Sequence, residues 1–360
     1  MSKVLKVAVI GCGGIAKGKH LPSLSKQKEV ELVAFCDIIE ERAAEANEKY
    51  GNENSKVYTD YKKLLEESGA EVIHVCTPND SHAEITIASL ESGRHVMCEK
   101  PMAKTSEQAR AMLDAAKRTG KKLSIAYQNR FRSDSQYLKK LCEDGELGDI
   151  YLGKALAIRR RAVPTWGVFL DEEKQGGGPL IDIGTHALDL TLWLMDNYEP
   201  KSVTGSVFHK LGSRKNAANA FGSWDPEEFK VEDSAFGFIT MKNGATIILE
   251  SSWALNVLEI GEAQTILSGT EGGADMKNGL RLNGEKNSRL WETKVDLSSG
   301  GVAFYEGEEE TDAYLEAKSW VQAVLEDSEP LVKPEQALVV TEILEAIYES
   351  ARTGKTVYFD

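Results

Sequence analysis

A glycine-rich turn near the amino terminus limits the possible folds of this 360-residue chain more than any other feature. Gly11, Gly13 and Ala16 lie between the apolar run 7–10 and a helix expected to begin near Ile15. In the Gly-x-Gly-x-x-Gly/Ala fingerprint, the first glycine allows a tight turn, the second lets backbone approach a pyrophosphate, and the last small residue permits close helix–strand packing. Because the turn follows a strand and opens a helix, it predicts a dinucleotide-binding βαβ unit, with a plain glycine turn as the alternative.

The same unit suggests which dinucleotide is bound. Gly14 and Ile15 begin the expected helix, whose N–H groups and dipole attract an anion, so we expect them among the cofactor contacts. Asp37 ends the second expected strand, where the fingerprint carries a carboxylate for the adenosine ribose hydroxyls. That carboxylate would repel a 2′-phosphate, and no arginine follows before Arg42, so NAD is favoured over NADP. Asp37 could instead only cap the next helix, although the two roles are compatible.

Strands and helices alternate through the first third of the chain, which predicts an α/β Rossmann domain over residues 1–126. Continuous apolar strands that alternate with helices imply a parallel, doubly wound sheet. A helix that Thr59 could cap follows the third strand. The other expected helices start near residue 15 and span 39–50, 83–90 and 106–118, and the expected strands are 7–10, 30–36, 57–58, 72–76, 95–98 and 123–126.

The pattern changes near Tyr127, and residues 127–360 are expected to form an α+β domain with a mostly antiparallel, open-faced sheet. Lys242-Asn243-Gly244 predicts a hairpin, since Asn-Gly tolerates the positive φ angles of a type I′ turn. The polar segment 210–230 is interpreted as a lid or a subunit contact. The expected strands are 150–161, 201–208, 234–241, 245–253 and 264–268, a turn is expected at 269–273, and helices at 182–195, 312–325 and 335–352 are available to cover one face.

Composition excludes several classes of partner. A net charge of −14 argues against nucleic acid and against anionic membrane surfaces, both of which attract positive patches. No run is long and apolar enough to span a bilayer, and no signal-like region opens the chain, so a cytoplasmic protein is expected. The five cysteines lack paired metal spacing, and four lie in or beside expected buried strands. They are therefore interpreted as reduced buried thiols, with no metal site.

Two further loops follow expected strands. They are Thr77-Pro78-Asn79 and Glu99-Lys100-Pro101. Ligands of an open α/β sheet bind outside the carboxyl ends of its strands, so these loops and the glycine turn should face one crevice. The arrangement predicts a dinucleotide pocket with Lys100 aimed into it. Whether the bond before Pro101 is cis is left open by the sequence.

With these motifs and the run Gly-Gly-Gly-Pro-Leu-Ile-Asp-Ile-Gly-Thr-His at 176–186, the chain resembles the Gfo/Idh/MocA oxidoreductase family over nearly its whole length. That family includes glucose-fructose oxidoreductase, inositol dehydrogenases and pyranoside dehydrogenases. The resemblance implies a first domain that binds NAD or NADP and a second domain for substrate binding and assembly. Asn79 is expected near the nicotinamide ribose and His82 in a mainly structural position. The further expected cofactor contacts are Thr77, Pro78, His82, Glu99 and Lys100.

Asp182 and His186 are the strongest catalytic candidates besides Lys100. They are four residues apart on an expected helix, so both side chains project from one face. Oxidation of a secondary alcohol requires a group that accepts the hydroxyl proton, and histidine titrates near neutral pH. We predict that His186 is this base, that Asp182 binds substrate hydroxyls and orients it, and that Lys100 stabilises the oxygen and lowers the pKa of His186. The family uses its matching residues in this way; a packed core histidine is the alternative.

Weaker candidates surround this set. The segment 127–131 resembles a family segment that reaches the substrate, which nominates Asn129 and Arg130. Asp189 could join the face of Asp182 or have a surface or capping role. The arginines at 159–161 are interpreted as a solvated edge or a subunit contact, although one could bind a substrate oxygen while Trp166 stacks on a sugar ring.

The sequence thus predicts an NAD-dependent dehydrogenase that oxidises a secondary hydroxyl of a sugar or glycoside. A pyranose ring is the first choice of substrate and inositol the second. An NAD-retaining glycoside hydrolase and a non-catalytic NAD-binding sensor are alternatives. A homodimer or homotetramer is expected, because a sheet with one open face needs a partner.

Overall fold

The computed structural model describes residues 3–297 and 310–360, which belong to two compact units. The first unit combines the chain up to Gln128 with the segment that carries α9 (Asp312–Leu325) and the start of α10 (Pro334–Thr353), as far as Leu338. The second unit begins at Asn129 and includes the remainder of α10 and the carboxyl terminus. The sequence suggested a single domain boundary after residue 126. The structure places this boundary two residues later, and α9 belongs to the first unit.

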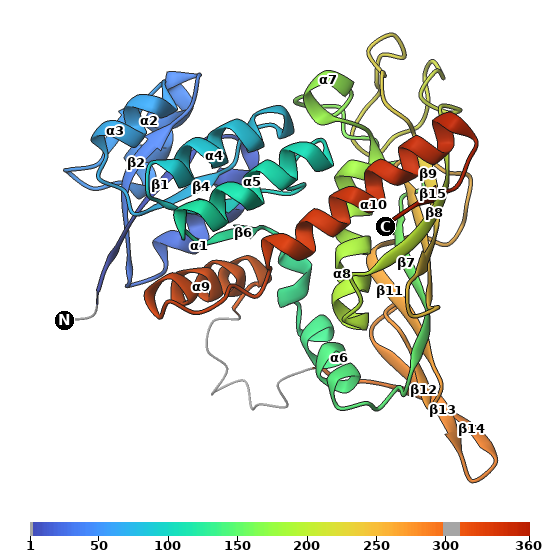
Figure 1. The fold of residues 1–360 in the computed structure, drawn as a ribbon. Coiled ribbons are helices and arrows are strands. Elements are labelled where there is room, and N and C mark those ends of the chain that lie inside the picture. The colour runs from blue at the N-terminus through green and yellow to red at the C-terminus, as the bar shows by residue number, and fades with distance from the viewer. Residues whose placement is uncertain (1–2, 298–309) are drawn as a thin grey trace. The chain divides into compact units, whose positions relative to one another are not determined.

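The described part of the first unit contains a six-stranded parallel sheet with the order β3-β2-β1-β4-β5-β6 (Figure 1). This is the order of doubly wound dinucleotide-binding folds, in which the strand order reverses between the first and fourth strands. The predicted parallel sheet is therefore confirmed. Its strands are β1 (Leu5–Ile10), β2 (Val30–Cys36), β3 (Lys56–Tyr58), β4 (Val72–Val75), β5 (His95–Cys98) and β6 (Leu123–Ile125).

Helices cover both faces of this sheet. On one face, α1, α2 and α9 contribute Leu24, Ala43 and Trp320 to a buried cluster with Val7 and Val9 of β1. The neighbouring pair α4 and α5 packs beside β4 and β5 (Figure 1). The helices of this unit, besides α9, are α1 (Leu21–Ser25), α2 (Glu40–Tyr50), α3 (Tyr61–Glu67), α4 (His82–Glu91), α5 (Ser106–Thr119), the π-helix η1 (Ala16–His20) and the 3-10 turn η2 (Asn79–Ser81).

The second unit is built on a nine-stranded sheet within its described residues. All neighbouring strands are antiparallel except β7 and β10, so the predicted mostly antiparallel sheet is confirmed. The order is β14-β13-β12-β11-β7-β10-β9-β8-β15. The strands are β7 (Ile150–Ile158), β8 (Pro200–Phe208), β9 (Ser234–Met241), β10 (Thr246–Ser252), β11 (Gly261–Gly269), β12 (Gly272–Asp275), β13 (Arg281–Lys286), β14 (Arg289–Lys294) and β15 (Val357–Tyr358).

One face of this sheet is covered by helices. The helix α8 (Thr185–Met195) packs on β7 and β11, and α10 lies so close to β8 and β9 that a Cβ at Gly205 or Gly237 would come within 2.7 Å of Ile347. The opposite face carries the exposed side chains of Phe208 and Phe238. The remaining helices of this part of the chain are η3 (Gln128–Phe131), α6 (Ser133–Glu143), α7 (Glu172–Gln175) and η4 (Leu180–Gly184).

Several local predictions are wrong, and each has a physical reason. The sequence assigned α9 to the second sheet, but its apolar face packs in the first unit, because an amphipathic helix does not specify which sheet it covers. Asp60, and not Thr59, caps α3 by accepting a hydrogen bond from the N–H of Lys62. The hairpin between β9 and β10 is confirmed, but its turn is not type I′. That turn needs positive φ angles at both central residues, here Lys242 and Asn243, whereas the positive φ, of 91°, falls on Gly244.

The cysteines behave as the sequence suggested. Cys12, Cys36, Cys76 and Cys98 are buried free thiols, and Cys142 is half-buried. Burial raises the pKa of Cys12 and of Cys36 to about 12, so both remain protonated at neutral pH. The described helices include none that is both long and apolar enough to cross a membrane.

A buried cluster of charged and polar side chains connects η1 to three other segments of the first unit: β4, the end of β5 and α9. Lys19 Nζ lies 2.9 Å from Glu99 Oε1 and 2.8 Å from Glu316 Oε2. His20 Nε2 lies 2.7 Å from the same Glu99 oxygen, and its Nδ1 lies 2.9 Å from Nδ1 of His74. Glu99 follows β5 and Glu316 lies on α9, so the cluster joins the first helical turn, the lysine loop and α9.

Lys19 is the cation on which this cluster depends. Burial opposes ionisation of Glu99, but the ammonium of Lys19 and the hydrogen bond from His20 outweigh it and hold the pKa of Glu99 well below its usual range. Burial also disfavours the charged form of Lys19, yet the carboxylates of Glu316 and Glu99 raise its pKa. A buried carboxylate that loses its partner is strongly destabilising.

We expect Lys19→Met to lower the stability of the protein by about 3–5 kcal/mol, because it leaves Glu99 as an uncompensated buried charge. Urea unfolding measures the effect. Lys17→Met is the matched control on the same turn, since Lys17 pairs with Glu45 at the surface and such pairs contribute about 1 kcal/mol or less. Equal unfolding midpoints for the two variants would contradict the assigned role of Lys19.

Candidate active site

The glycine turn between β1 and η1 forms the first part of the site. Gly11 has a φ of 90°, and a Cβ there would lie 2.6 Å from the carbonyl carbon of Cys76 and 2.7 Å from the nitrogen of Thr77. A side chain is therefore excluded at this position by both conformation and space. Ala16 is fully buried, as expected for the small residue that permits close packing.

Gly13 and Gly14 differ from Gly11 in their surroundings. A Cβ built on either residue meets no atom within 4 Å, and Ile15 beside them is 43% exposed. The protein therefore leaves open space over the backbone where the fingerprint expects a pyrophosphate. This open cradle fits an NAD cofactor, with the N–H groups at the start of the helical segment available to an anion.

Asp37 braces the glycine turn. One of its carboxylate oxygens accepts a hydrogen bond from the N–H of Cys12 at 2.9 Å, and the other accepts one from the N–H of Ile39 at 2.9 Å. The second bond closes the turn before α2, whose N-cap residue is Ile39 itself. Asp37 thus has a structural role in the glycine turn, and its contact with the adenosine ribose remains a prediction that is compatible with it.

His82 links the two loops that follow β4 and β5. It is fully buried, and its ring nitrogens lie 2.8 Å from the carbonyl oxygen of Pro101 and 2.9 Å from that of Thr77. Asn79, two residues after Thr77, is also buried, whereas Pro78 is exposed. The structure supports the structural role expected of His82, because this ring holds the Thr77 loop against the Lys100 loop.

Lys100 follows β5 and is half-buried. The peptide bond between Lys100 and Pro101 is cis, which answers the question that the sequence left open. The backbone N–H of Lys100 donates to Glu99 Oε2 at 3.1 Å, while Glu99 Oε1 faces Lys19 and His20. The carboxylate of Glu99 thus anchors the lysine loop to the core, and its expected contact with the cofactor remains a prediction.

The second unit carries Asp182 and His186 on two consecutive helical segments. The sequence predicted one helix from residue 182, but Asp182 lies in the π-helix η4 and His186 in the first turn of α8. Short π-helical turns are frequent at functional sites. Glu232 caps the start of η4, because its carboxylate accepts hydrogen bonds from the N–H groups of Gly178 at 2.7 Å and Leu180 at 3.1 Å.

The glycine run before η4 is explained by this cap. A Cβ on Gly178 would lie 2.2 Å from the carbonyl oxygen of Glu232, so only a glycine lets the two segments approach. Tyr348 donates a further hydrogen bond to Glu232 at 2.9 Å. The glycines therefore serve the entry into the helix that carries Asp182, as the sequence suggested.

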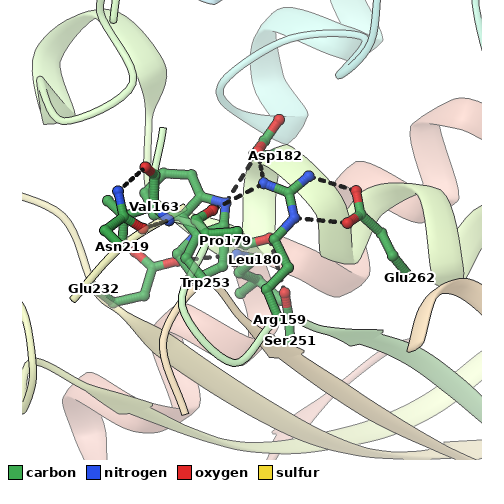
Figure 2. A network of polar contacts seen from close by, with 11 residues as sticks. Arg159, Val163, Pro179, Leu180, Asp182, Asn219, Glu232, Ser251, Trp253 and Glu262 are labelled. Atoms are coloured by element: carbon green, nitrogen blue, oxygen red, sulfur yellow. Dashed lines mark hydrogen bonds and ion pairs between the residues drawn. The ribbon is translucent and has the colours of Figure 1, made fainter. Parts of the chain in front are cut away.

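Asp182 is held by two side chains that the sequence did not connect to it (Figure 2). The indole N–H of Trp253 donates to Asp182 Oδ2 at 3.0 Å, and Arg159 Nη1 lies 4.0 Å from the same oxygen. Arg159 in turn makes two hydrogen bonds to Glu262, at 2.6 and 2.5 Å. The strand expected to run to residue 161 ends at Ile158, so Arg159 reaches Asp182 and is not the solvated strand edge that the sequence favoured.

Trp166 stands at the exposed end of an aromatic row. It is 53% exposed and makes edge-to-face contacts with Phe221 at 4.9 Å and with Phe169 at 5.8 Å between ring centroids. Phe169 continues the row to the buried Trp253 at 6.3 Å. Trp166 is therefore connected to Asp182 through two aromatic rings.

The segment 210–230 is anchored to the backbone near Trp166. The side chain of Asn219 accepts from the N–H of Val163 at 2.8 Å and donates to its carbonyl at 2.9 Å. The hydroxyl of Thr165 donates to the carbonyl of Phe221 at 2.6 Å. These bonds place the 46% exposed ring of Phe221 beside Trp166.

Two weaker predictions are revised. Arg130 has no exposed surface; its guanidinium binds Asp189 through contacts of 2.9 and 2.6 Å, so it fixes α8 and does not reach toward a sugar. Asp189 is accordingly a buried ion-pair partner, with neither a surface nor a capping role. Asn129 is half-buried at the start of the second unit, and its substrate contact remains a prediction.

Sequence reasoning missed Trp253, Glu232 and Glu262 as supporting residues. Each acts on a partner at least 50 residues away in the chain, and each lies in or beside a strand that reads as ordinary sheet. The available signal was the triple arginine after β7, since a buried or half-buried arginine requires a carboxylate partner.

Comparisons with known proteins agree with this fold. Residues 5–127 match the oxidoreductase family domain described as an NAD-binding Rossmann fold, and residues 139–359 match the carboxyl-terminal alpha/beta domain of the same family. The chain is 38% identical to the D-glucoside 3-dehydrogenase of Escherichia coli over 357 residues, which cover 99% of this chain and 98% of that protein. An inositol 2-dehydrogenase of Salmonella typhimurium is 29% identical over 53% of this chain and 55% of its own.

Solved structures show the same architecture. The levoglucosan dehydrogenase in complex with NADH and L-sorbose superposes with a TM-score of 0.82 at 24% identity, over 99% of each chain. GenD2 from gentamicin A biosynthesis, in complex with NAD, gives a TM-score of 0.77 at 26% identity, over 100% of this chain and 97% of its own. The fold and site define a dinucleotide-binding oxidoreductase. The chain belongs to the Gfo/Idh/MocA oxidoreductase family, and its first domain is an NAD-binding Rossmann fold.

We expect Gly13→Ala to weaken NAD binding at least tenfold with little loss of stability. The added methyl group meets no protein atom, but it occupies the space over the backbone where the pyrophosphate is expected. Calorimetric titration with NAD and a thermal melt measure the two effects. Gly18→Ala is the matched control, because its Cβ also meets open space but lies outside the fingerprint. Unchanged NAD affinity in Gly13→Ala would contradict the assigned cradle.

Proposed function

We propose that this protein is an NAD-dependent dehydrogenase that oxidises a secondary ring hydroxyl of a pyranose or glycoside. The observation that carries the proposal is a fixed carboxylate, Asp182, on the segment that continues into the helix of His186, in a family of NAD-binding oxidoreductases. The choice of a glycoside is supported by the near full-length similarity to the D-glucoside 3-dehydrogenase. Inositol is the second candidate substrate, supported by the similarity to inositol 2-dehydrogenases.

The first unit supplies the cofactor site. Bound NAD accepts the hydride that leaves the carbon bearing the hydroxyl group. Gly11, Gly13, Gly14 and Ile15 would hold the pyrophosphate, and Asp37 the adenosine ribose. Thr77, Pro78 and Asn79 would line the nicotinamide end, because their loop follows the neighbouring strand of the same sheet.

The catalytic roles follow from side-chain chemistry. His186 accepts the hydroxyl proton, because a neutral imidazole is a competent base near pH 7. Asp182, as a carboxylate, accepts hydrogen bonds from sugar hydroxyls and orients the ring toward that base. Lys100 stabilises the negative charge that develops on the oxygen as its proton leaves. Its backbone is fixed for this purpose by Glu99 and, through Pro101, by His82.

Trp166 and Phe221 provide an apolar surface connected to Asp182. Sugar rings present C–H groups on their faces, which pack well against aromatic rings. We therefore include Trp166 in the substrate site, together with Asn129 at the start of the second unit. The segment 210–230 then supplies one wall of the sugar site by holding Phe221 against Trp166.

We further propose a cytoplasmic homodimer or homotetramer. The sheet face opposite α8 and α10 exposes Phe208, Phe238 and Tyr358, which belong to three neighbouring strands. Their exposed fractions are 38%, 51% and 74%. An exposed apolar face of this kind is typical of a subunit contact.

The test of the proposal is the appearance of NADH with NAD and a panel of glucose, methyl glucosides, other aldoses and inositols. We expect turnover with glucosides, and a loss of at least 100-fold in kcat with Lys100→Ala or His186→Ala, the range typical of general acid–base and electrostatic catalysis. Glycoside cleavage that requires NAD but gives no net NADH, with NAD regenerated in each turnover, would instead indicate the NAD-retaining hydrolase. NAD binding without turnover of any compound would indicate the sensor.

Trp166→Ala is expected to raise the KM for methyl glucoside about three- to tenfold and to leave kcat nearly unchanged, as for the loss of one aromatic contact of 0.5–1.5 kcal/mol. Steady-state kinetics measure both constants, and Trp166→Phe should restore most of the affinity. Trp291→Ala is the control, since Trp291 is a comparably exposed tryptophan on β14. An unchanged KM would remove Trp166 from the site.

A further inference from the structure

Arg159 lies between two carboxylates of the second unit (Figure 2). Its guanidinium makes two hydrogen bonds to Glu262 and lies 4.0 Å from Asp182. The side chain of Arg159 is 20% exposed and that of Asp182 is 9% exposed, so water screens this contact only partly. A third hydrogen bond, donated by Nη1 to the carbonyl oxygen of Ala162 at 3.2 Å, also fixes the guanidinium.

The backbone of β11 is distorted at the residue that binds Arg159. The register between β11 and β7 shifts between Gly261 and Gln264, as in a β-bulge. Within this bulge Ala263 has a φ of 50°, an unfavourable conformation for a residue with a side chain. Arg132 holds the distortion by donating to the carbonyl of Ala263 at 2.8 Å. Bulges beside active sites re-aim side chains, and here the distortion lies directly next to Glu262.

The charges of the three side chains do not cancel. Arg159 contributes one positive charge, and Asp182 and Glu262 contribute one negative charge each. Burial lowers the pKa of Arg159, but the hydrogen bonds and charge of Glu262, together with the charge of Asp182, raise it overall, so the guanidinium stays charged. Without Glu262, an arginine at this place would be free to attract a sugar phosphate or a uronate, because guanidinium groups bind such anions in a bidentate manner.

We propose that Glu262 is a specificity-determining residue that, by binding Arg159, keeps the group formed by Asp182, Arg159 and Glu262 net negative and restricts the sugar site to uncharged substrates. Arg159 is then a positioning residue that holds Asp182. It does not bind the substrate, because Glu262 occupies its guanidinium. The inference rests on the proposed sugar dehydrogenase function.

The experiment compares methyl β-D-glucoside with methyl β-D-glucuronide, two substrates that differ in a carboxylate at C6. The measured quantity is the ratio of their kcat/KM values. In the wild-type protein we expect the glucoside to be preferred at least tenfold. In Glu262→Gln the preference should fall roughly tenfold, because one negative charge has been removed from the site. In Arg159→Gln the preference should increase, since the remaining charges are both negative.

Two variants separate charge from structure. Glu262→Asp keeps the charge and should keep the preference, even if a shorter side chain reduces both rates. Glu292→Gln is the matched control, because Glu292 pairs with Arg281 on the hairpin of β13 and β14 and should leave the ratio unchanged.

The outcomes are distinct. A wild-type protein that oxidises neither compound nor any other sugar of the panel overturns the proposed function and this inference with it. An active wild-type protein whose ratio is the same in Glu262→Gln and Glu292→Gln overturns the inference alone. Equal losses of preference in Glu262→Gln and Glu262→Asp would show that the geometry of the bulge, and not the charge of Glu262, sets the specificity, which also overturns it.

Discussion

The ion pair between Lys19 and Glu99 is the interaction on which the first unit of this protein depends. It brings an ammonium and a carboxylate together in a place from which water is almost excluded, and Glu316 and His20 complete the arrangement. Buried pairs of this kind contribute little net stability compared with apolar packing, but losing one partner is costly, so they enforce one arrangement of the segments that carry them. Here those segments are the helical turn after the glycine fingerprint, the strand end before Lys100 and the helix α9.

In the second unit, two buried carboxylates fix the π-helix η4 through hydrogen bonds that they accept. Glu232 accepts from the backbone at the start of this π-helix, and Asp182 within it accepts from Trp253. Both carboxylates have very little exposed surface, so each requires donors to compensate for the water it has lost. The glycine at 178 is needed for the first contact, because any side chain there would overlap the backbone of Glu232. The glycine run before η4 is therefore a closely packed segment, although its sequence is typical of a flexible turn.

The elements that the sequence predicted correctly are those with a local cause. Strands of the first sheet are apolar runs between helices, and their parallel order follows from the alternation. The strands β9 and β10 appeared because a glycine turn separates two alternating runs, although the turn type was wrong. The strands β13 and β14 were not expected, because their sequences are polar and largely exposed, and only pairing with neighbours makes them strands. The role of Arg159 was not predicted either, because its partners Asp182 and Glu262 are distant in the chain.

By itself, the sequence determined the dinucleotide fingerprint, the lysine loop, the helical spacing of Asp182 and His186, and the division into a parallel and a mostly antiparallel domain. These are properties of neighbouring residues, whose periodicity and steric requirements act over a few positions. Tertiary structure alone decided that α9 covers the first sheet, that Arg130 is buried against Asp189, and that Trp253, Arg159 and Glu262 surround Asp182. The physical reason is that burial and charge compensation depend on which distant segments come together, and no local pattern records that choice.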